Sequence, residues 1–312
     1  MRGVVRRPKL GSAGYGSPML GEALALGAAM AWSVSVILFR RSEAITPLGM
    51  NLFKNSVAVV LLALTLLVLG QGIAWQRSSD DWWKLCISGV LGIGIADTLI
   101  FMALRRLGPS RLAIVDCVYA PVIVLASVLF LGEHVGPAFL VGAVLVVGGV
   151  LLGAATSNRD PRPPKDHAPI AVGVALGLSG IVAMAVGVVL AKRPLERSNL
   201  VEVTLVRLVA GIASQLVWIA LVPAERLAFA AFRPGAAWRT LVPAAVLSAY
   251  VSMLMWLGGF KWANASTAAV LNQMSTVFTI VLARLVLGEP LTRRRALGGL
   301  MAISGAIIVL KP

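Results

Sequence analysis

The sequence predicts an all-α membrane protein with ten transmembrane helices, arranged as two inverted five-helix repeats. Hydrophobic residues make up 58% of the 312 residues and charged residues only 13%, which is far from the composition of a soluble domain. The apolar residues come in runs of about 20, the length that crosses roughly 30 Å of hydrocarbon. The chain also repeats itself, and an internal repeat determines how the rest of a sequence is interpreted.

The repeat is clearest between residues 103–154 and 259–310, which align without a gap at a shift of 156 positions. Leucine-rich helices match partly by chance. The informative match is therefore a Gly-Glu step in one fixed register, which ends at Glu133 in the first copy and at Glu289 in the second.

Apolar runs predict ten spans in order along the chain: 20–39, 47–69, 84–104, 111–131, 136–156, 169–191, 199–222, 240–260, 265–287 and 295–310. The first five form one copy of the repeat, 20–156, and the last five form the second, 169–310. Residues 1–19 are basic and rich in Gly and Pro, and we expect a disordered tail there. Residues 157–168 are polar and Pro-rich, which is typical of a linker.

The odd number of spans in each copy determines how the copies are related. After five crossings the second copy enters from the opposite side of the membrane, so the two copies are expected to be inverted. Many secondary transporters have this architecture, with a substrate site near the midplane between the repeats. Ten crossings place both termini on one side. Lys and Arg divide almost evenly between the two sides, so the positive-inside rule does not say which side that is.

Composition and motifs exclude several other classes of function. The net charge of +15 lies in loops and tails, which indicates contact with anionic lipid rather than with nucleic acid. Both cysteines, Cys86 and Cys117, lie in apolar runs, and only two histidines are present, so we expect no disulfide, metal site or cofactor. The sequence lacks the HExxH and GxSxG motifs of hydrolases and the P-loop of ATP-driven transport.

Ionisable residues inside spans are candidates for a charge site, because a charge at the bilayer centre costs about 3 kcal/mol. Asp97 lies well inside the third span. It is either a proton-coupling or cation-binding carboxylate, or a packing residue that is neutral or paired with Lys54. Lys54 and Arg207 lie about two helical turns into their spans. They suit a carboxylate or phosphate on the substrate, or their long side chains reach the interface.

Polar and aromatic side chains within spans are candidates for a substrate cavity. The aromatic rings suit a planar or amphipathic substrate, or they pack between helices. The predicted cavity is lined by Trp32, Asp97, Asp116, Tyr119, Tyr250, Trp256, Asn272 and Gln273.

Small and acidic residues have structural interpretations. Glycines at helical spacings allow close helix packing, either within the chain or across a homodimer. They are Gly142, Gly148, Gly149, Gly298, Gly299 and Gly305. Glu133 and Glu289 follow short turns and are expected to begin the next helix, where an acid complements the helix dipole.

Three short patterns carry a resemblance to a known family. The first copy contains Ala113, Pro121 and the sequence Leu-Gly-Glu at 131–133, and the second repeats Ala269 and Leu-Gly-Glu-Pro at 287–290. With tandem five-helix halves and a basic residue in each second helix, the chain resembles the EamA domain of the drug/metabolite transporter superfamily.

The resemblance covers residues 20–310. It implies a ten-helix carrier with cytoplasmic termini, which moves small metabolites across a bacterial inner membrane, usually outward. The sequence departs from the equivalence of its two copies at Val277, where the first copy has Pro121, and at Asn272, where it has Asp116. The contributions of the two halves to a central site are therefore expected to differ.

The expected function is alternating-access export of amino acids or related small organic compounds. Import or exchange of a drug, a nucleotide-type or a phosphorylated compound remains an alternative, as does a non-transport structural role. Coupling to a proton or ion gradient, exchange, and facilitated diffusion all remain open. The expected partners are a small-molecule substrate and the lipid bilayer, and a homodimer is also compatible with the sequence.

Overall fold

The computed structural model describes residues 18–39, 45–154, 170–287 and 292–310, and within them all regular structure is helical. The helices of the first half are α1 (Pro18–Phe39), α2 (Pro47–Val68), α3 (Ser79–Gly89), η1 (Val90–Ile95), α4 (Ala96–Asp116), α5 (Tyr119–Ala126), η2 (Ser127–Leu131) and α6 (Pro137–Ala154). Those of the second half are α7 (Ile170–Arg197), α8 (Leu200–Leu221), η3 (Pro223–Phe232), α9 (Trp238–Ala245), η4 (Val246–Ser252), α10 (Met253–Trp262), α11 (Ala265–Asn272), α12 (Met274–Leu287) and α13 (Arg293–Val309).

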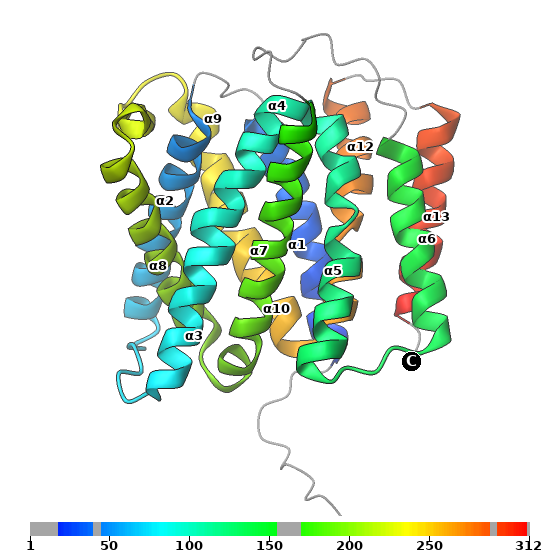
Figure 1. Cartoon of the computed structure of the whole chain (residues 1–312), viewed down its shortest axis with the longest axis horizontal. Coiled ribbons are helices and arrows are strands. Elements are labelled where there is room, and N and C mark those ends of the chain that lie inside the picture. The colour runs from blue at the N-terminus through cyan, green and yellow to red at the C-terminus, as the bar shows by residue number, and fades with distance from the viewer. Residues whose placement is uncertain (1–17, 40–44, 155–169, 288–291, 311–312) are drawn as a thin grey trace, which may run out of the picture.

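The helices stand side by side in one bundle (Figure 1). By length and composition, seven helical stretches of the described chain can cross a membrane, and three shorter apolar helices accompany them: Tyr119–Leu131, Pro137–Leu152 and Ala296–Val309. These ten stretches follow the order of the ten expected spans. The fold is therefore that of an all-helical membrane protein. Helices suit this environment because they satisfy their own backbone hydrogen bonds where no water is available.

Several boundaries differ from the prediction. Helix α3 begins at Ser79 rather than at 84, and α7 ends at Arg197 rather than at 191. Helix α4 remains helical as far as Asp116, across the loop expected between residues 104 and 111, because helical turns pair backbone groups that an open loop would leave unpaired. The expected tail 1–19 also ends too late, since Pro18 and Met19 already belong to α1. The rest of that tail and the linker 157–168 lie outside the described residues.

Two irregular features recur in the same register of the repeat. The π-helical segments η1 and η4 begin at Val90 and Val246, which are equivalent at the shift of 156. Interruptions between helices also match, because α5 follows Cys117 and Val118, and α12 follows Gln273, which is equivalent to Cys117. Single π-helical turns occur frequently at functional sites. The repeat therefore extends to these two backbone features, whereas the π-helical segment η2 of the first half has no counterpart in the regular helix α12 of the second.

Helices from the two halves pack in equivalent pairs. Helix α4 packs on α7 as α10 packs on α1, and η1 packs on α8 as η4 packs on α2. In Figure 1, α1 runs from the lower end of the bundle to the upper end, whereas α7 runs downward. The N-terminal end of α1 and the C-terminal end of α13 lie at the same end of the bundle.

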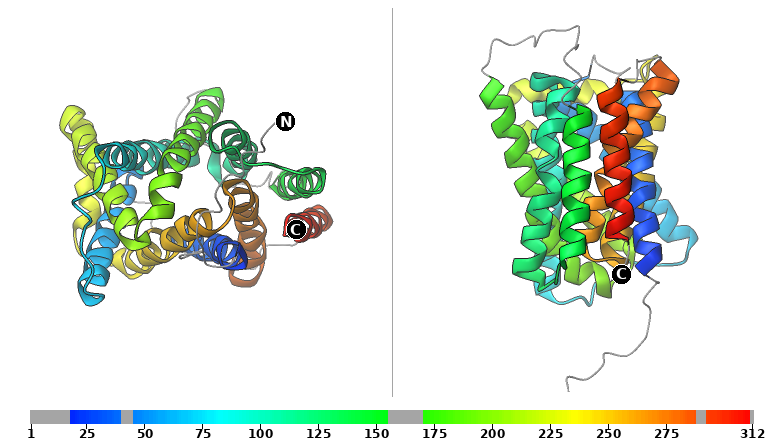
Figure 2. Two further views of the ribbon diagram at one scale, coloured as in Figure 1. Left: turned by 90° about the horizontal axis from the view of Figure 1, so that it is seen from below. Right: turned by 90° about the vertical axis from the view of Figure 1, so that its right-hand side faces the viewer.

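Glycine contacts hold α6 against α13, which stand beside each other at one edge of the bundle (Figure 2). A Cβ atom on Gly142 would lie 2.8 Å from the carbonyl oxygen of Gly305, and one on Gly149 would lie 2.4 Å from that of Gly298. Gly142 is equivalent to Gly298 and Gly149 to Gly305, so each copy supplies the same two positions. The predicted packing role is confirmed for Gly142, Gly149, Gly298 and Gly305, whose contacts lie within the chain. Gly148 and Gly299 were predicted with them, but the nearest atoms to a Cβ at these positions are 3.9 Å and 3.7 Å away, so they make no close approach.

The predicted position of Glu133 is wrong. Glu133 precedes α6, which begins at Pro137, and its carboxylate instead caps α11 of the other half. Its two oxygens accept hydrogen bonds from the backbone nitrogens of Ala265, at 2.6 Å, and Ser266, at 3.0 Å, and from the Ser266 hydroxyl at 2.6 Å. An acid at a helix N-terminus complements the dipole as expected, but on a distant helix. Its counterpart Glu289 lies outside the described residues.

A methyl group at Gly149 should separate α6 from α13. Overpacking of this kind costs about 1–3 kcal/mol, so we expect Gly149→Ala to lower the midpoint of thermal unfolding of the purified protein in detergent. The control is Gly148→Ala on the same helix, because the nearest atom to its new Cβ, Met301 Cε, is 3.9 Å away. Equal midpoints for the two variants would contradict the packing account.

Removal of the Glu133 carboxylate should destabilise the start of α11. Loss of a helix cap costs about 1 kcal/mol, so Glu133→Ala is expected to lower the unfolding midpoint and to raise hydrogen exchange at Ala265 and Ser266. Glu225→Ala is the control, because no hydrogen bond to that carboxylate is seen within the described residues. A stability equal to that of the control variant would show that the cap contributes nothing.

Candidate functional site

A buried ion pair joins two of the predicted charge residues. Lys54 of α2 lies 2.8 Å from the Asp97 carboxylate of α4, and the exposed fractions of their side chains are 2% and 15%. Lys54 also donates to Asn55 at 3.0 Å and lies over the Phe101 ring. Asp97 is therefore paired with Lys54, which was one of its two predicted arrangements. The pairing offsets part of the solvation free energy that either charge would lose in an apolar bundle.

A chain of buried amides continues from this ion pair to the π-helical segment η1. Asn55 donates to Asn51 at 3.0 Å, and Asn51 donates to the Ile93 carbonyl at 3.1 Å. Gln215 of α8 makes a longer contact of 3.5 Å with the same carbonyl. A π-helical turn breaks the regular i→i−4 hydrogen-bond pattern. The Ile93 carbonyl of η1 is approached by a side-chain amide from each half, Asn51 from the first and Gln215 from the second. This network was not predicted from the sequence, although the two amides Asn51 and Asn55 within one apolar span are a signal of it.

Arg207 of α8 is fully buried in the second half. Its guanidinium lies over the Trp256 ring, 5.9 Å from the ring centre, and close to Gly92 of η1. It is within electrostatic range of Asp97 and Tyr119. Among the residues that the structure describes, its Nε, Nη1 and Nη2 atoms have no hydrogen-bond partner. Arg207 does not reach the interface, and it places unpaired donors beside three predicted site residues.

The two helix interruptions meet where the halves join. Gln273 donates to the backbone carbonyl of Asp116 at 2.9 Å, and Asp116 is the last residue of α4 rather than a residue inside a fourth helix. In the described part of the chain, the Asn272 side-chain nitrogen and the Gln273 side-chain oxygen are buried without a partner. Three of the predicted polar residues therefore lie together at this junction.

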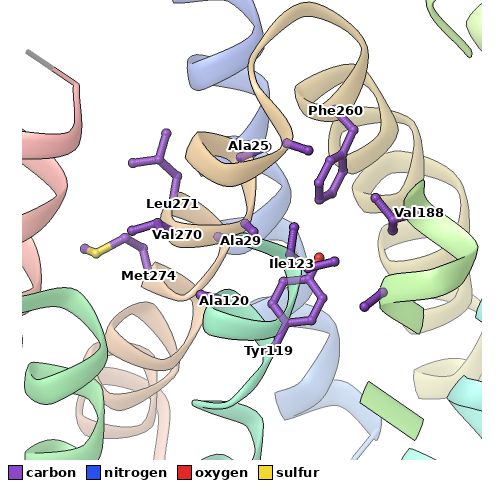
Figure 3. Close-up of a cluster of buried hydrophobic side chains, with 14 of the residues drawn as sticks. Ala25, Ala29, Tyr119, Ala120, Ile123, Val188, Phe260, Val270, Leu271 and Met274 are labelled. Carbon is purple, nitrogen blue, oxygen red and sulfur yellow. The ribbon is translucent and has the colours of Figure 1, made fainter. Parts of the chain in front are cut away.

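The four predicted aromatic residues divide between different surroundings. Tyr119 lies in the large apolar cluster with Ile123 and Phe260 (Figure 3), against which Trp256 packs. Tyr250 belongs to a separate cluster, and its hydroxyl lies 2.7 Å from that of Thr65. The structure thus brings Tyr119 and Trp256 to Arg207 and binds Tyr250 to α2.

Trp32 is half-buried on α1. Its carbonyl accepts a hydrogen bond from the Ser35 hydroxyl at 2.7 Å. A place for its ring in the predicted cavity stays a prediction.

One polar pocket lies away from this group. It has a volume of about 170 Å³ and is lined by Leu131, Glu133, Lys192, Arg193, Glu196 and Asn264. Lys192 donates to the carbonyl of Ala263, which follows the last residue of α10, at 2.9 Å, and it pairs with Glu196. Glu133, on the same pocket, caps the N-terminus of α11. Polar contacts therefore hold helix ends together around this pocket.

Comparisons with known proteins agree with this architecture. The model of the EamA-like transporter family matches the chain twice, over residues 19–154 and 171–311. An uncharacterized transporter, sll1164, of Synechocystis sp. (strain ATCC 27184 / PCC 6803 / Kazusa) is 23% identical over 254 residues, which is 80% of this chain and 72% of the relative. A protein crystal structure with 19% sequence identity has a TM-score of 0.77 and covers 94% of this chain and 97% of its own.

The two family matches account for nearly all of the described helices, one for each half of the bundle. A transporter family of this kind is not enzymatic, which agrees with the lack of catalytic motifs. The chain belongs to the EamA-like transporter family and is a multi-pass membrane transporter.

Proposed function

We propose that this protein exports amino acids or related small organic compounds across a bacterial inner membrane by alternating access. In this proposal the ten helical stretches all cross the membrane, as two inverted repeats at residues 20–156 and 169–310 with both termini in the cytoplasm. The outward direction and the inner membrane rest on what the family resemblance implies. The family membership shown above supports transport.

The observation that carries the proposal is the paired interruption of helices in the two halves. An interrupted helix leaves backbone groups unpaired inside the membrane, and transporters of inverted-repeat architecture bind solutes at such places. Here both interruptions occur in one register and are joined by the Gln273–Asp116 hydrogen bond. They lie where the two halves meet, as a site that opens alternately to each side requires.

The charges around this junction favour a substrate that carries both signs. Asp97 and Asp116 offer carboxylates, and Arg207 offers a guanidinium with unpaired donors. An α-amino acid carries an ammonium group and a carboxylate on the same carbon atom. The remaining predicted residues, Trp32, Tyr119, Tyr250, Trp256, Asn272 and Gln273, are proposed as the cavity wall.

The equivalent helix pairs support rocking of one half against the other. Opposed directions of α1 and α7, and crossed glycine contacts between α6 and α13, are what a two-fold axis in the membrane plane produces. Rocking in either direction then gives two nearly equivalent conformations of the bundle, which open the central site to opposite sides of the membrane. A substrate bound at that site is carried across as the conformation changes.

Asp97 is proposed as the coupling carboxylate. In proteoliposomes with a labelled amino-acid panel, a proton gradient should drive transport by the wild-type protein. Asp97→Asn should lower that gradient-driven transport by about tenfold or more, because an amide cannot take up and release a proton as a carboxyl group does. The comparison of uptake with and without the gradient separates coupling from binding.

Asp80→Asn is the matched control for this experiment. It makes the same chemical change on an acid whose side chain is 68% exposed and which pairs with Lys84 on one helix face, so transport should stay at the wild-type rate. Equal gradient-driven transport by Asp97→Asn and wild type would make Asp97 a packing residue. Failure of every amino acid to be transported would reject the proposed substrate class.

A further inference from the structure

Lys54 and Arg207 occupy equivalent places in the two halves but have different partners. Each is the eighth residue of its helix, α2 or α8. In the first half Asp97 neutralises Lys54. The position equivalent to Asp97 at the shift of 156 is Met253, the first residue of α10. The second half therefore keeps the cation and lacks the acid that would pair with it.

The missing acid leaves Arg207 without an ion-pair partner of its own among the described residues. The Asp97 carboxylate lies within electrostatic range of Arg207, but it forms its 2.8 Å ion pair with Lys54. Three guanidinium nitrogens of Arg207 remain without a hydrogen-bond partner in the described chain. Buried donors in this condition favour a ligand that supplies acceptor oxygens.

The surroundings of Arg207 suit an organic anion rather than a bare ion. The Trp256 ring faces the guanidinium on one side, and Tyr119 lies in the same cluster. Gly92 leaves the approach to Nη2 free of a side chain, since even a Cβ there would lie only 3.3 Å from that atom. Aromatic faces offer an apolar surface to the body of a ligand, while the guanidinium fork matches the two oxygens of a planar carboxylate.

We propose that Arg207 binds the carboxylate of the substrate, whose flat or apolar part lies against Trp256 and Tyr119. The proposal rests on the proposed function, because a fully buried guanidinium is reached only when the bundle opens. The substrate anion then supplies to Arg207 the charge that Asp97 supplies to Lys54.

The test is a binding titration of the purified full chain in detergent. Phenylacetate is the probe, its neutral amide phenylacetamide has the same shape without the charge, and sodium chloride supplies an anion without an organic part. Tryptophan fluorescence, to which Trp256 contributes, and the midpoint of thermal unfolding are measured. Phenylacetate should give a saturable change, and the amide should bind about tenfold or more weakly, as expected for the loss of a charge-assisted hydrogen bond.

Substitutions locate the site. Arg207→Gln should abolish the response to phenylacetate, Arg207→Lys should weaken it because an ammonium lacks the bidentate fork, and the exposed Arg239→Gln should leave it unchanged. Met253→Asp restores the acid that the repeat lacks. It should raise the unfolding midpoint and eliminate phenylacetate binding, while Met253→Asn should do neither. Folding of each variant is checked by a monodisperse size-exclusion peak.

Three results would overturn the proposal: equal binding of phenylacetate and its amide, an unchanged response in folded Arg207→Lys and Met253→Asp, or an equal effect of chloride. The experiment is separate from the transport assay. A protein that binds phenylacetate through Arg207 but transports no amino acid retains this site and loses the proposed function. If the protein transports amino acids but does not bind phenylacetate, the proposed function stands and the carboxylate site at Arg207 is rejected.

Discussion

The absence of water in the hydrocarbon layer is the constraint on which the rest of this structure depends. Every backbone group and charge inside the bundle must find its partner within the protein. Lys54 finds Asp97, Gln273 meets the carbonyl at the end of α4, and the Ile93 carbonyl of the π-helical turn receives side-chain amides. Irregular backbone is therefore found where polar side chains from neighbouring helices form hydrogen bonds with it. Arg207 departs from this rule within the described residues, and for that reason it is the residue most informative about the ligand.

The two halves have the same backbone plan but have diverged in their charges. Glycine contacts between α6 and α13 use the same two positions in each copy, because close helix packing in lipid depends on small residues at fixed spacing. Buried polar positions have no such restriction. Asp97 corresponds to Met253, and Asp116 corresponds to Asn272, yet η1 and η4 and the two interruptions remain in register. A symmetrical framework thus holds an asymmetrical set of charges, which allows a bound solute to have one preferred orientation.

Much of this fold follows from the sequence, because apolar runs of membrane-spanning length and a repeat in fixed register are local signals. Most span ends agree with the structure to within a few residues, and the glycine packing was predictable from its helical spacing. Contacts between distant segments were not. Glu133 caps a helix that begins 132 residues later, and no periodicity points there. The helix interruptions at Cys117 and Gln273 were also missed, since both lie within long apolar runs and hydropathy does not register a break in backbone hydrogen bonding.

The cap at Glu133 also has an energetic consequence for conformational exchange. This one carboxylate receives three hydrogen bonds from the opposite half, at the end of the bundle where α1 begins and α13 ends. In the proposed rocking of the halves, separation at that end would expose this anion and its three donors. The three bonds would be lost together, because they share one carboxylate.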